Sequence, residues 1–260
     1  MCRLFNKLLK KSTAKRGWGQ TAFMTTCNLW NFKKILAGSF LVLASCGATW
    51  AQAALPNGKT TVIYFGQQKA AEFDSKIKPF FAEQSRPCKS CELVNYTPYD
   101  SQGEVDVEAL QERITSLPEG TSFVFFDFNM KVTDTNKELV QILSKKAAAG
   151  LVIVGSAGVP PVSESSGPLS RTVLGQVPGA LIIGELGERD RLVPTGFYGP
   201  EMLTALRPPK DHIGQGYSPL IFAANLAENW QKRSPQEWVD YLRNKKSKSR
   251  KIWMGLNDMF

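Results

Sequence analysis

Ser218 is the residue of this chain whose position best suits nucleophilic chemistry. It follows Gly216 and Tyr217 and opens an apolar, alanine-rich run, residues 219–227, that predicts a helix. A helix start offers unpaired backbone N–H groups and the positive end of the helix dipole, and both stabilise a developing oxyanion. Ser-Pro is also an ordinary N-cap and first-turn pair. The choice between these two hypotheses depends on whether the chain supplies a base, an acid and an oxyanion donor.

His212 is the single histidine of the sequence and therefore the candidate base for Ser218. It lies six residues earlier and directly after Asp211, so an Asp-His-Ser cluster is one hypothesis and a surface loop histidine is the other. Asp127 and Asn129 follow a buried strand, at the edge of a sheet where α/β proteins bind ligands. Their alternative role is to cap the turn between strand and helix.

Cys88 and Cys91 are the two cysteines that follow the basic and apolar leader described below. In an exported protein, a Cys-Lys-Ser-Cys sequence predicts a short-loop disulfide. A redox pair would need a strand before it and a helix after it, whereas a helical stretch precedes and a strand-like stretch follows here. A zinc site would need two further Cys or His ligands nearby, so the sequence predicts no metal. It predicts no cofactor either.

Residues 1–53 are interpreted as a leader. They hold eight basic residues and no acidic one, and Lys33-Lys34 precedes an apolar run, residues 35–44, that is typical of a secretory signal. Cleavage before Ala54 would release the protein into the periplasm or the medium. Cleavage before Cys46, which lies in a lipoprotein-like sequence, would tether it to a membrane. An uncleaved anchor is the third alternative.

The remainder of the chain has nearly balanced charge, with 24 basic and 23 acidic residues. The formal net charge of +9 therefore gives no reason to expect nucleic acid as a partner. Six basic residues fall within the nine positions 243–251, shortly before Trp253. This composition predicts a basic tail, residues 243–260, that either meets an anionic envelope surface or is a solvated helix end.

Between these segments, residues 54–242 are expected to form one α/β domain with three layers, a mostly parallel sheet flanked by helices. The expected strands are residues 60–65, 92–98, 122–126, 151–154 and 180–184. The expected helices are residues 70–83, 107–117, 135–149, 218–227 and 235–243, with Gly150 as a C-cap residue. Residues 160–178, rich in Ser, Gly and Pro, are expected to form a long surface loop.

Five segments, in this order, give the chain a resemblance to subtilisin-like serine peptidases over residues 60–243. They are Val62-Ile63-Tyr64-Phe65-Gly66; the helix 137–150 with the strand leading to Gly155-Ser156-Ala157-Gly158; Pro178-Gly179-Ala180-Leu181-Ile182-Ile183-Gly184-Glu185-Leu186; Gly216-Tyr217-Ser218; and Ser234-Pro235-Gln236-Glu237-Trp238. The resemblance implies a subtilisin-like fold, the nucleophile position at Ser218, and substrate-binding segments that contain Gly158 and Gly216.

The other parts of the catalytic site that the resemblance implies are missing. Tyr64 and Phe65 stand where the first strand of the family ends in aspartate, no histidine lies between Thr60 and Cys91, and Val159 stands where the oxyanion asparagine is expected. Without a base and an orienting acid, a serine is a poor nucleophile. The sequence therefore predicts an exported pseudopeptidase that binds a peptide or protein at the former active-site face, by addition of a strand to the sheet edge. The alternative is an active serine endopeptidase that uses Ser218.

Overall fold

The computed structural model describes residues 59–67, 69–85, 88–158, 166–193, 196–213, 216–249 and 259–260. The chain divides into two compact units, Met1–Ala51 and Gln52–Phe260, and every described residue belongs to the second. The predicted leader, both cleavage sites, Cys46 and Val159 lie outside the described residues. In the described part of the chain, no helix is long and apolar enough to cross a membrane.

The second unit is built on one six-stranded sheet with the strand order β2-β1-β3-β4-β5-β6. Every neighbouring pair is parallel, which confirms the predicted parallel α/β sheet. The strands are β1 (Thr60–Phe65), β2 (Cys91–Asn95), β3 (Thr121–Phe126), β4 (Val152–Ser156), β5 (Leu181–Glu185) and β6 (Met202–Leu206). The central strands are almost continuously apolar because both of their faces are covered by helices.

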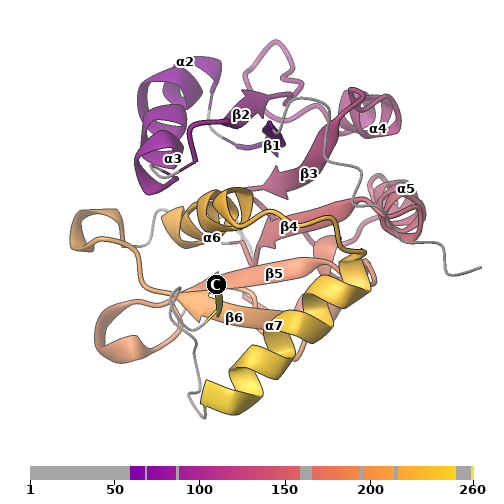
Figure 1. The fold of residues 1–260 in the computed structure, drawn as a ribbon. Coiled ribbons are helices and arrows are strands. Elements are labelled where there is room, and N and C mark those ends of the chain that lie inside the picture. The colour runs from indigo at the N-terminus through magenta and orange to yellow at the C-terminus, as the bar shows by residue number, and fades with distance from the viewer. Residues whose placement is uncertain are drawn as a thin grey trace, which may run out of the picture. The chain divides into compact units, whose positions relative to one another are not determined.

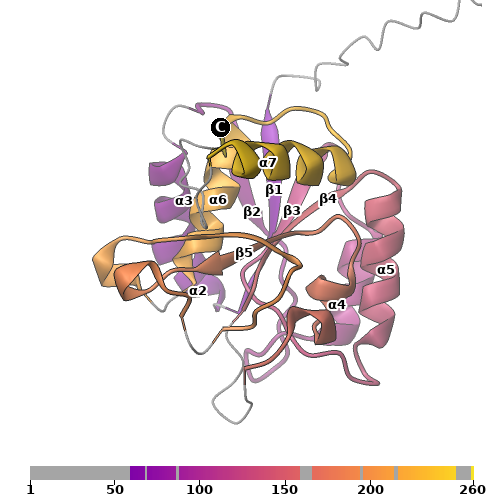
Figure 2. The same ribbon diagram turned by 90° about the horizontal axis from the view of Figure 1, so that it is seen from below.

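Two groups of helices cover the two faces of the sheet (Figures 1 and 2). One face carries α2 (Ala70–Glu72), a π-helical segment (Phe73–Ile77), α3 (Lys78–Gln84), α6 (Tyr217–Glu228) and α7 (Pro235–Ser249). The other carries α4 (Val107–Thr115), α5 (Lys137–Ala148) and two 3₁₀ turns, Leu169–Arg171 and Leu174–Gln176. These are the three layers that the sequence predicts. Gly150 follows α5 with a φ of 100°, in agreement with its expected C-cap role.

Three predictions about elements are wrong. Strand β6 was not foreseen, because Met-Leu-Thr-Ala-Leu has one β-branched residue and no alternating pattern. Helix α7 does not end at Arg243 but continues to Ser249 through a stretch in which three of the six residues are lysines, which favour helix. The described part of the expected surface loop, residues 166–178, is partly buried, since its Leu169, Val173 and Leu174 pack into the core on the α5 side.

The last two residues return to the core on the α6 side of the sheet. Met259 has no exposed surface, and the ring of Phe260 lies 5.8 Å from that of Phe222 in α6. The same core contains Val62 of β1, so residues near both ends of the described chain share one apolar cluster.

Candidate functional site at the carboxyl edge of the sheet

Four side chains line the carboxyl ends of neighbouring strands, on the face that α6 covers. They follow from the alternation of side chains along each strand. The α6-side core contains Tyr64 of β1, Phe125 of β3, Val154 of β4 and Ile183 of β5. Two positions after the last three of these residues come Asp127, Ser156 and Glu185, so alternation places their side chains on the same face as Tyr64. Helix α6 contacts β1, β4 and β5, and Gly216, directly before the helix, lines one pocket with Ser156 and Glu185.

Tyr64 and Asp127 form the most strongly coupled pair of the site. The Tyr64 hydroxyl donates a hydrogen bond to Asp127 Oδ2, and the Gln67 N–H donates one of 2.9 Å to Asp127 Oδ1. Burial raises the pKa of Asp127 to about 6, and the two hydrogen bonds only partly oppose this effect. Burial first, and then the neighbouring Asp127 charge, raise the pKa of Tyr64 well above its usual range. At neutral pH the tyrosine is therefore a hydrogen-bond donor and the aspartate is mostly ionised.

Gly66 makes this pair possible, because any side chain at position 66 would collide with the Tyr64 hydroxyl. Its N–H donates a 2.8 Å hydrogen bond to Thr97 Oγ1, and the Thr97 N–H donates to Asn95 Oδ1. The chain leaving β1 is thus fixed both to the end of β2 and to Asp127. The carboxylate has a defined orientation at the edge of the sheet.

Ser218 lies at the start of α6 as expected, but its hydroxyl is not presented to solvent. The side chain has no exposed surface, and its Oγ donates a 2.8 Å hydrogen bond to the Leu206 carbonyl at the end of β6. It is not the N-cap residue either, since Gly216 has that position with a φ of 77° and Tyr217 begins the helix. The hydroxyl of Ser218 therefore links the start of α6 to the end of β6 by a hydrogen bond.

His212 belongs to an aromatic cluster. Its ring lies 4.4 Å from that of Tyr217 and 5.2 Å from that of Phe80 in α3, and its Nδ1 lies 3.1 Å from Asp211 Oδ1. In the described part of the chain, no hydrogen bond joins His212 to Ser218. The histidine therefore packs a short 3₁₀ turn, Lys210–His212, against α3.

Gly158 and Gly216, the two glycines expected to contact substrate, line the same pocket of about 150 Å³. Both have a positive φ, of 78° and 77°, which favours glycine. The pocket lies at the ends of β4 and β5. Its other lining residues are Ser156, Ala157, Gly184, Glu185, Leu192, Val193, Gly196, Phe197, Tyr198 and Met202. The Tyr198 side chain is 54% exposed and is the large apolar group most accessible to a ligand here.

Asn129 is a structural residue. It is almost fully buried, its amide donates to Thr172 Oγ1 at 2.9 Å, and its Oδ1 accepts the N–H groups of Met130 and Leu174. It thereby holds the 3₁₀ turns against the end of β3. Of the two polar residues that follow this strand, Asp127 alone lies in the candidate site.

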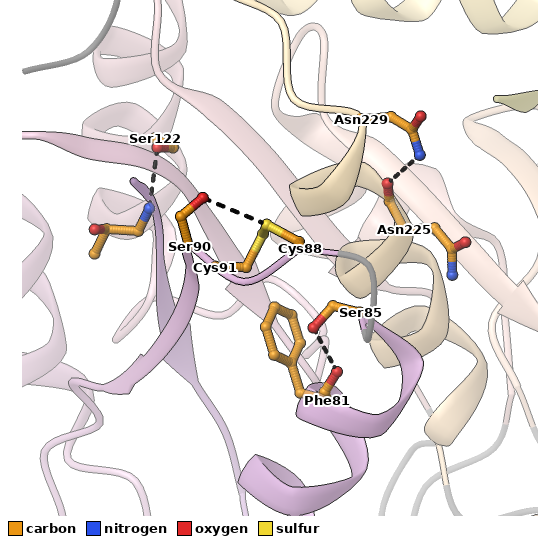
Figure 3. The surroundings of a disulfide bond; sticks show 9 residues. Phe81, Ser85, Cys88, Ser90, Cys91, Ser122, Asn225 and Asn229 are labelled. Carbon is orange, nitrogen blue, oxygen red and sulfur yellow. Dashed lines mark hydrogen bonds between the residues drawn. A yellow bond between two sulfur atoms is a disulfide. The ribbon is translucent and has the colours of Figure 1, made fainter. Parts of the chain in front are cut away.

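The structure joins Cys88 and Cys91 in a disulfide with a Cα–Cα distance of 5.4 Å, at the opposite edge of the sheet (Figure 3). The bond closes the turn between α3 and β2, and the Ser90 carbonyl inside this turn accepts the N–H of Thr60 at the start of β1. Figure 3 also shows Phe81 of α3 with Ser85 directly after this helix, and Asn225 of α6 with Asn229 directly after that one. Among the described residues, no group of three His, Cys, Asp or Glu side chains could hold a metal ion.

Comparison with solved structures identifies the fold. The crystal structure of a cold-adapted subtilisin-like serine proteinase is similar to this chain with a TM-score of 0.52 and 10% identity, over 72% of this chain and 82% of that one. A lanthipeptide protease matches with a TM-score of 0.48, 10% identity and coverage of 72% and 79%. Proteases from Pseudoalteromonas arctica match with a TM-score of 0.48 and 11% identity, over 61% of this chain and 57% of that one. No protein-family model and no curated protein match the sequence.

The first of these likenesses, with the six-stranded parallel sheet, confirms that the fold is subtilisin-like. The sequence predicted the fold and the position of Ser218 at a helix start, while the roles of Gly158 and Gly216 in substrate binding stay predictions. It did not find the pairing of Tyr64 with Asp127. The available signal was the aspartate directly after a buried strand, but its partner lies 63 positions earlier in the chain.

Proposed function

We propose that this chain is a peptide-binding domain that uses a subtilisin-like fold without peptide hydrolysis. The observation that carries the proposal is the state of Ser218, which is fully buried and donates its hydroxyl hydrogen to Leu206, beside an accessible apolar pocket that contains Gly216. A serine in that state lacks both the general base and the exposure that nucleophilic catalysis requires. Binding of a peptide in the pocket requires neither a general base nor an exposed serine hydroxyl.

The size and lining of the pocket favour one apolar side chain of a peptide. A cavity of about 150 Å³ accommodates a benzene ring. Here Leu192, Val193 and Phe197 provide apolar walls, while Glu185 and the exposed Tyr198 supply polar atoms at the same pocket. An apolar lining with few polar groups is typical of a ligand site. We therefore expect leucine- or phenylalanine-sized side chains to bind more tightly than alanine.

Covalent labelling and peptide binding test the two halves of this proposal. A fluorophosphonate probe should not label the protein. Labelling that is lost in Ser218→Ala would instead establish the alternative, an active serine endopeptidase. End-blocked pentapeptides Gly-Gly-X-Gly-Gly should bind about tenfold more tightly with X = Leu or Phe than with X = Ala, because each buried side chain contributes roughly 1.5–3 kcal/mol.

A substitution at Gly196 connects binding with the pocket. An added Cβ there meets only carbonyl oxygens at 3.5 Å, so Gly196→Leu should fill the pocket and abolish the preference for Leu or Phe. Gly167→Leu is the matched control, because nothing lies within 4 Å of its added Cβ and it does not line the pocket. Equal binding by Gly196→Leu and the unsubstituted protein would refute this assignment.

The same proposal includes export to the cell envelope. The leader composition supports cleavage before Cys46 or Ala54, and the basic residues 243–251 support contact with an anionic surface, as Arg243 is exposed. Intact-mass measurement of the protein recovered from envelope fractions should give an N-terminus at one of these two sites. Full-length precursor in those fractions would refute cleavage. Sedimentation with phosphatidylglycerol vesicles, but not with phosphatidylcholine vesicles, is expected if the tail meets anionic lipid.

A further inference from the structure

The chain connections diverge at the carboxyl ends of β1 and β3. β1 and β3 are neighbours in the sheet. The chain leaving β1 passes to the α6 side, where Phe73 and Ile77 are buried, and the chain leaving β3 passes to the other side, where Leu139 and Leu143 of α5 are buried. Ligands of open α/β sheets bind at such a reversal of strand order. Asp127 follows β3 at this point.

Asp127 is an oriented carboxylate that has no cationic partner among the described residues. Each of its oxygens accepts one hydrogen bond, from the Tyr64 hydroxyl or the Gln67 N–H. In the described part of the chain, none of its hydrogen bonds or ion pairs involves a lysine, arginine or histidine. Asp127 is half-buried and retains some exposed surface. A partly buried anion with no counter-ion is stabilised by any cation that fits beside it.

We propose that Asp127, whose carboxylate is oriented by the Tyr64 hydroxyl, binds a primary ammonium group at the carboxyl ends of β1 and β3. Each Asp127 oxygen retains acceptor capacity. An ammonium group carries three N–H donors on a compact charge and can reach acceptors that point in different directions. A guanidinium binds best to two carboxylate oxygens that are both free in one plane, whereas both oxygens here already accept hydrogen bonds.

The identity of the natural ligand rests on the proposed function, because the ammonium group would be the N-terminus or a lysine side chain of the bound peptide. The register continues from Phe126 and Gly155, so Asp127 lies beside Ser156, which lines the apolar pocket. Adjacent strands are about 4.8 Å apart. One short peptide can therefore reach the carboxylate and the apolar pocket together.

A titration with n-butylammonium chloride tests the site without any peptide. The full chain, labelled with ¹⁵N, is observed at pH 7.5 through the amide resonance of Gln67, which hydrogen-bonds to Asp127. We expect a saturable shift that tetramethylammonium, a cation without N–H donors, does not produce. Asp127→Asn should weaken binding at least tenfold and Tyr64→Phe about threefold, while Asp134→Asn, which alters an exposed carboxylate, should leave it unchanged.

The unsubstituted protein provides a second measurement if Asp127→Asn fails to fold. Binding should disappear as the pH falls through about 6, where Asp127 becomes protonated. Binding that is independent of pH, equal in Asp127→Asn, matched by tetramethylammonium, or weaker than that of guanidinium would overturn the proposal. Glycinamide and Nα-acetyl-lysinamide then distinguish an N-terminus from a lysine side chain as the source. Ammonium binding without pentapeptide binding would retain this site and refute the proposed function alone.

Discussion

Asp127 is a carboxyl group whose ionisation opposes folding, because burial raises its pKa to about 6 from the usual 3.8. Between these two values the folded protein holds a proton that the unfolded chain has released. The free energy of unfolding should therefore fall as the pH rises from about 4 to about 6, by no more than about 3 kcal/mol, and the contribution should be constant above that range. Urea denaturation from pH 4 to pH 8 measures this.

Asp127→Asn should remove this contribution. The difference between the unsubstituted protein and the variant isolates Asp127, since other carboxyl groups titrate in both. Asp134→Asn, at a side chain that is 98% exposed, should preserve the original pH dependence. Parallel pH profiles for the unsubstituted protein and Asp127→Asn would show that the carboxylate is not buried as described.

Ser218→Ala is expected to weaken folding only slightly. The substitution removes one hydrogen bond to the Leu206 carbonyl, but this carbonyl also accepts the Leu186 N–H at 2.7 Å and is not left without a donor. We therefore expect the free energy of unfolding to fall by about 0.5–1.5 kcal/mol and the peptide affinity to stay unchanged. The urea midpoint and the pentapeptide titration provide the two measurements. A large loss of affinity with unchanged stability would instead indicate a direct role for Ser218 in the site.

The site was only partly predictable from single residues. The Gly-Tyr-Ser sequence before an apolar run predicted a helix start at Ser218, and this local prediction was correct. Burial of its hydroxyl depends on β6, which the sequence did not reveal. Tyr64 departs from the subtilisin-like sequence pattern at the end of the first strand. Its pairing with Asp127 depends on β1 and β3 being adjacent in the sheet, which no local pattern encodes.

At the scale of elements, the disulfide should contribute modestly to stability and nothing to binding. The bond between Cys88 and Cys91 closes a loop of only a few residues, so it restricts the unfolded chain only modestly. Changing both cysteines to serine should therefore lower the free energy of unfolding by roughly 2 kcal/mol. The bond lies at the amino edge of the sheet and the candidate site at the carboxyl edge. Thermal or urea denaturation should detect the loss, while the pentapeptide affinity remains constant. A parallel loss of affinity would contradict the separation of the two edges.

The elements with strong periodic signals were the ones that the sequence predicted well. β3 and β4 are apolar on both faces, and α4 begins after Asp106, whose side chain accepts the Ala109 N–H at 3.0 Å. Failures came where tertiary packing overrides composition. Residues 169–176 look like a polar surface loop, yet Asn129 and the α5-side core hold them inward. Local composition does not report such contacts.

At the scale of the whole molecule, one apolar cluster connects β1 with the final residues of the chain. Met259 and Phe260 pack on the α6 side, in the cluster that includes Val62 and Trp238. Because these contacts span the described sequence, we expect the second unit to unfold as one cooperative body. Removal of the last two residues should therefore weaken the entire unit, including elements far from them.

Deletion of residues 259–260 should lower the free energy of unfolding by about 3 kcal/mol, since it exposes surface that Met259 and Phe260 bury. Tryptophan fluorescence and far-ultraviolet circular dichroism should still report one common urea transition, at a lower midpoint. Tyr198→Ala, at an exposed ring, is the control and should shift the midpoint little. Two separate transitions after the deletion, or an unchanged midpoint, would show that the C-terminal residues do not join the two ends of the core.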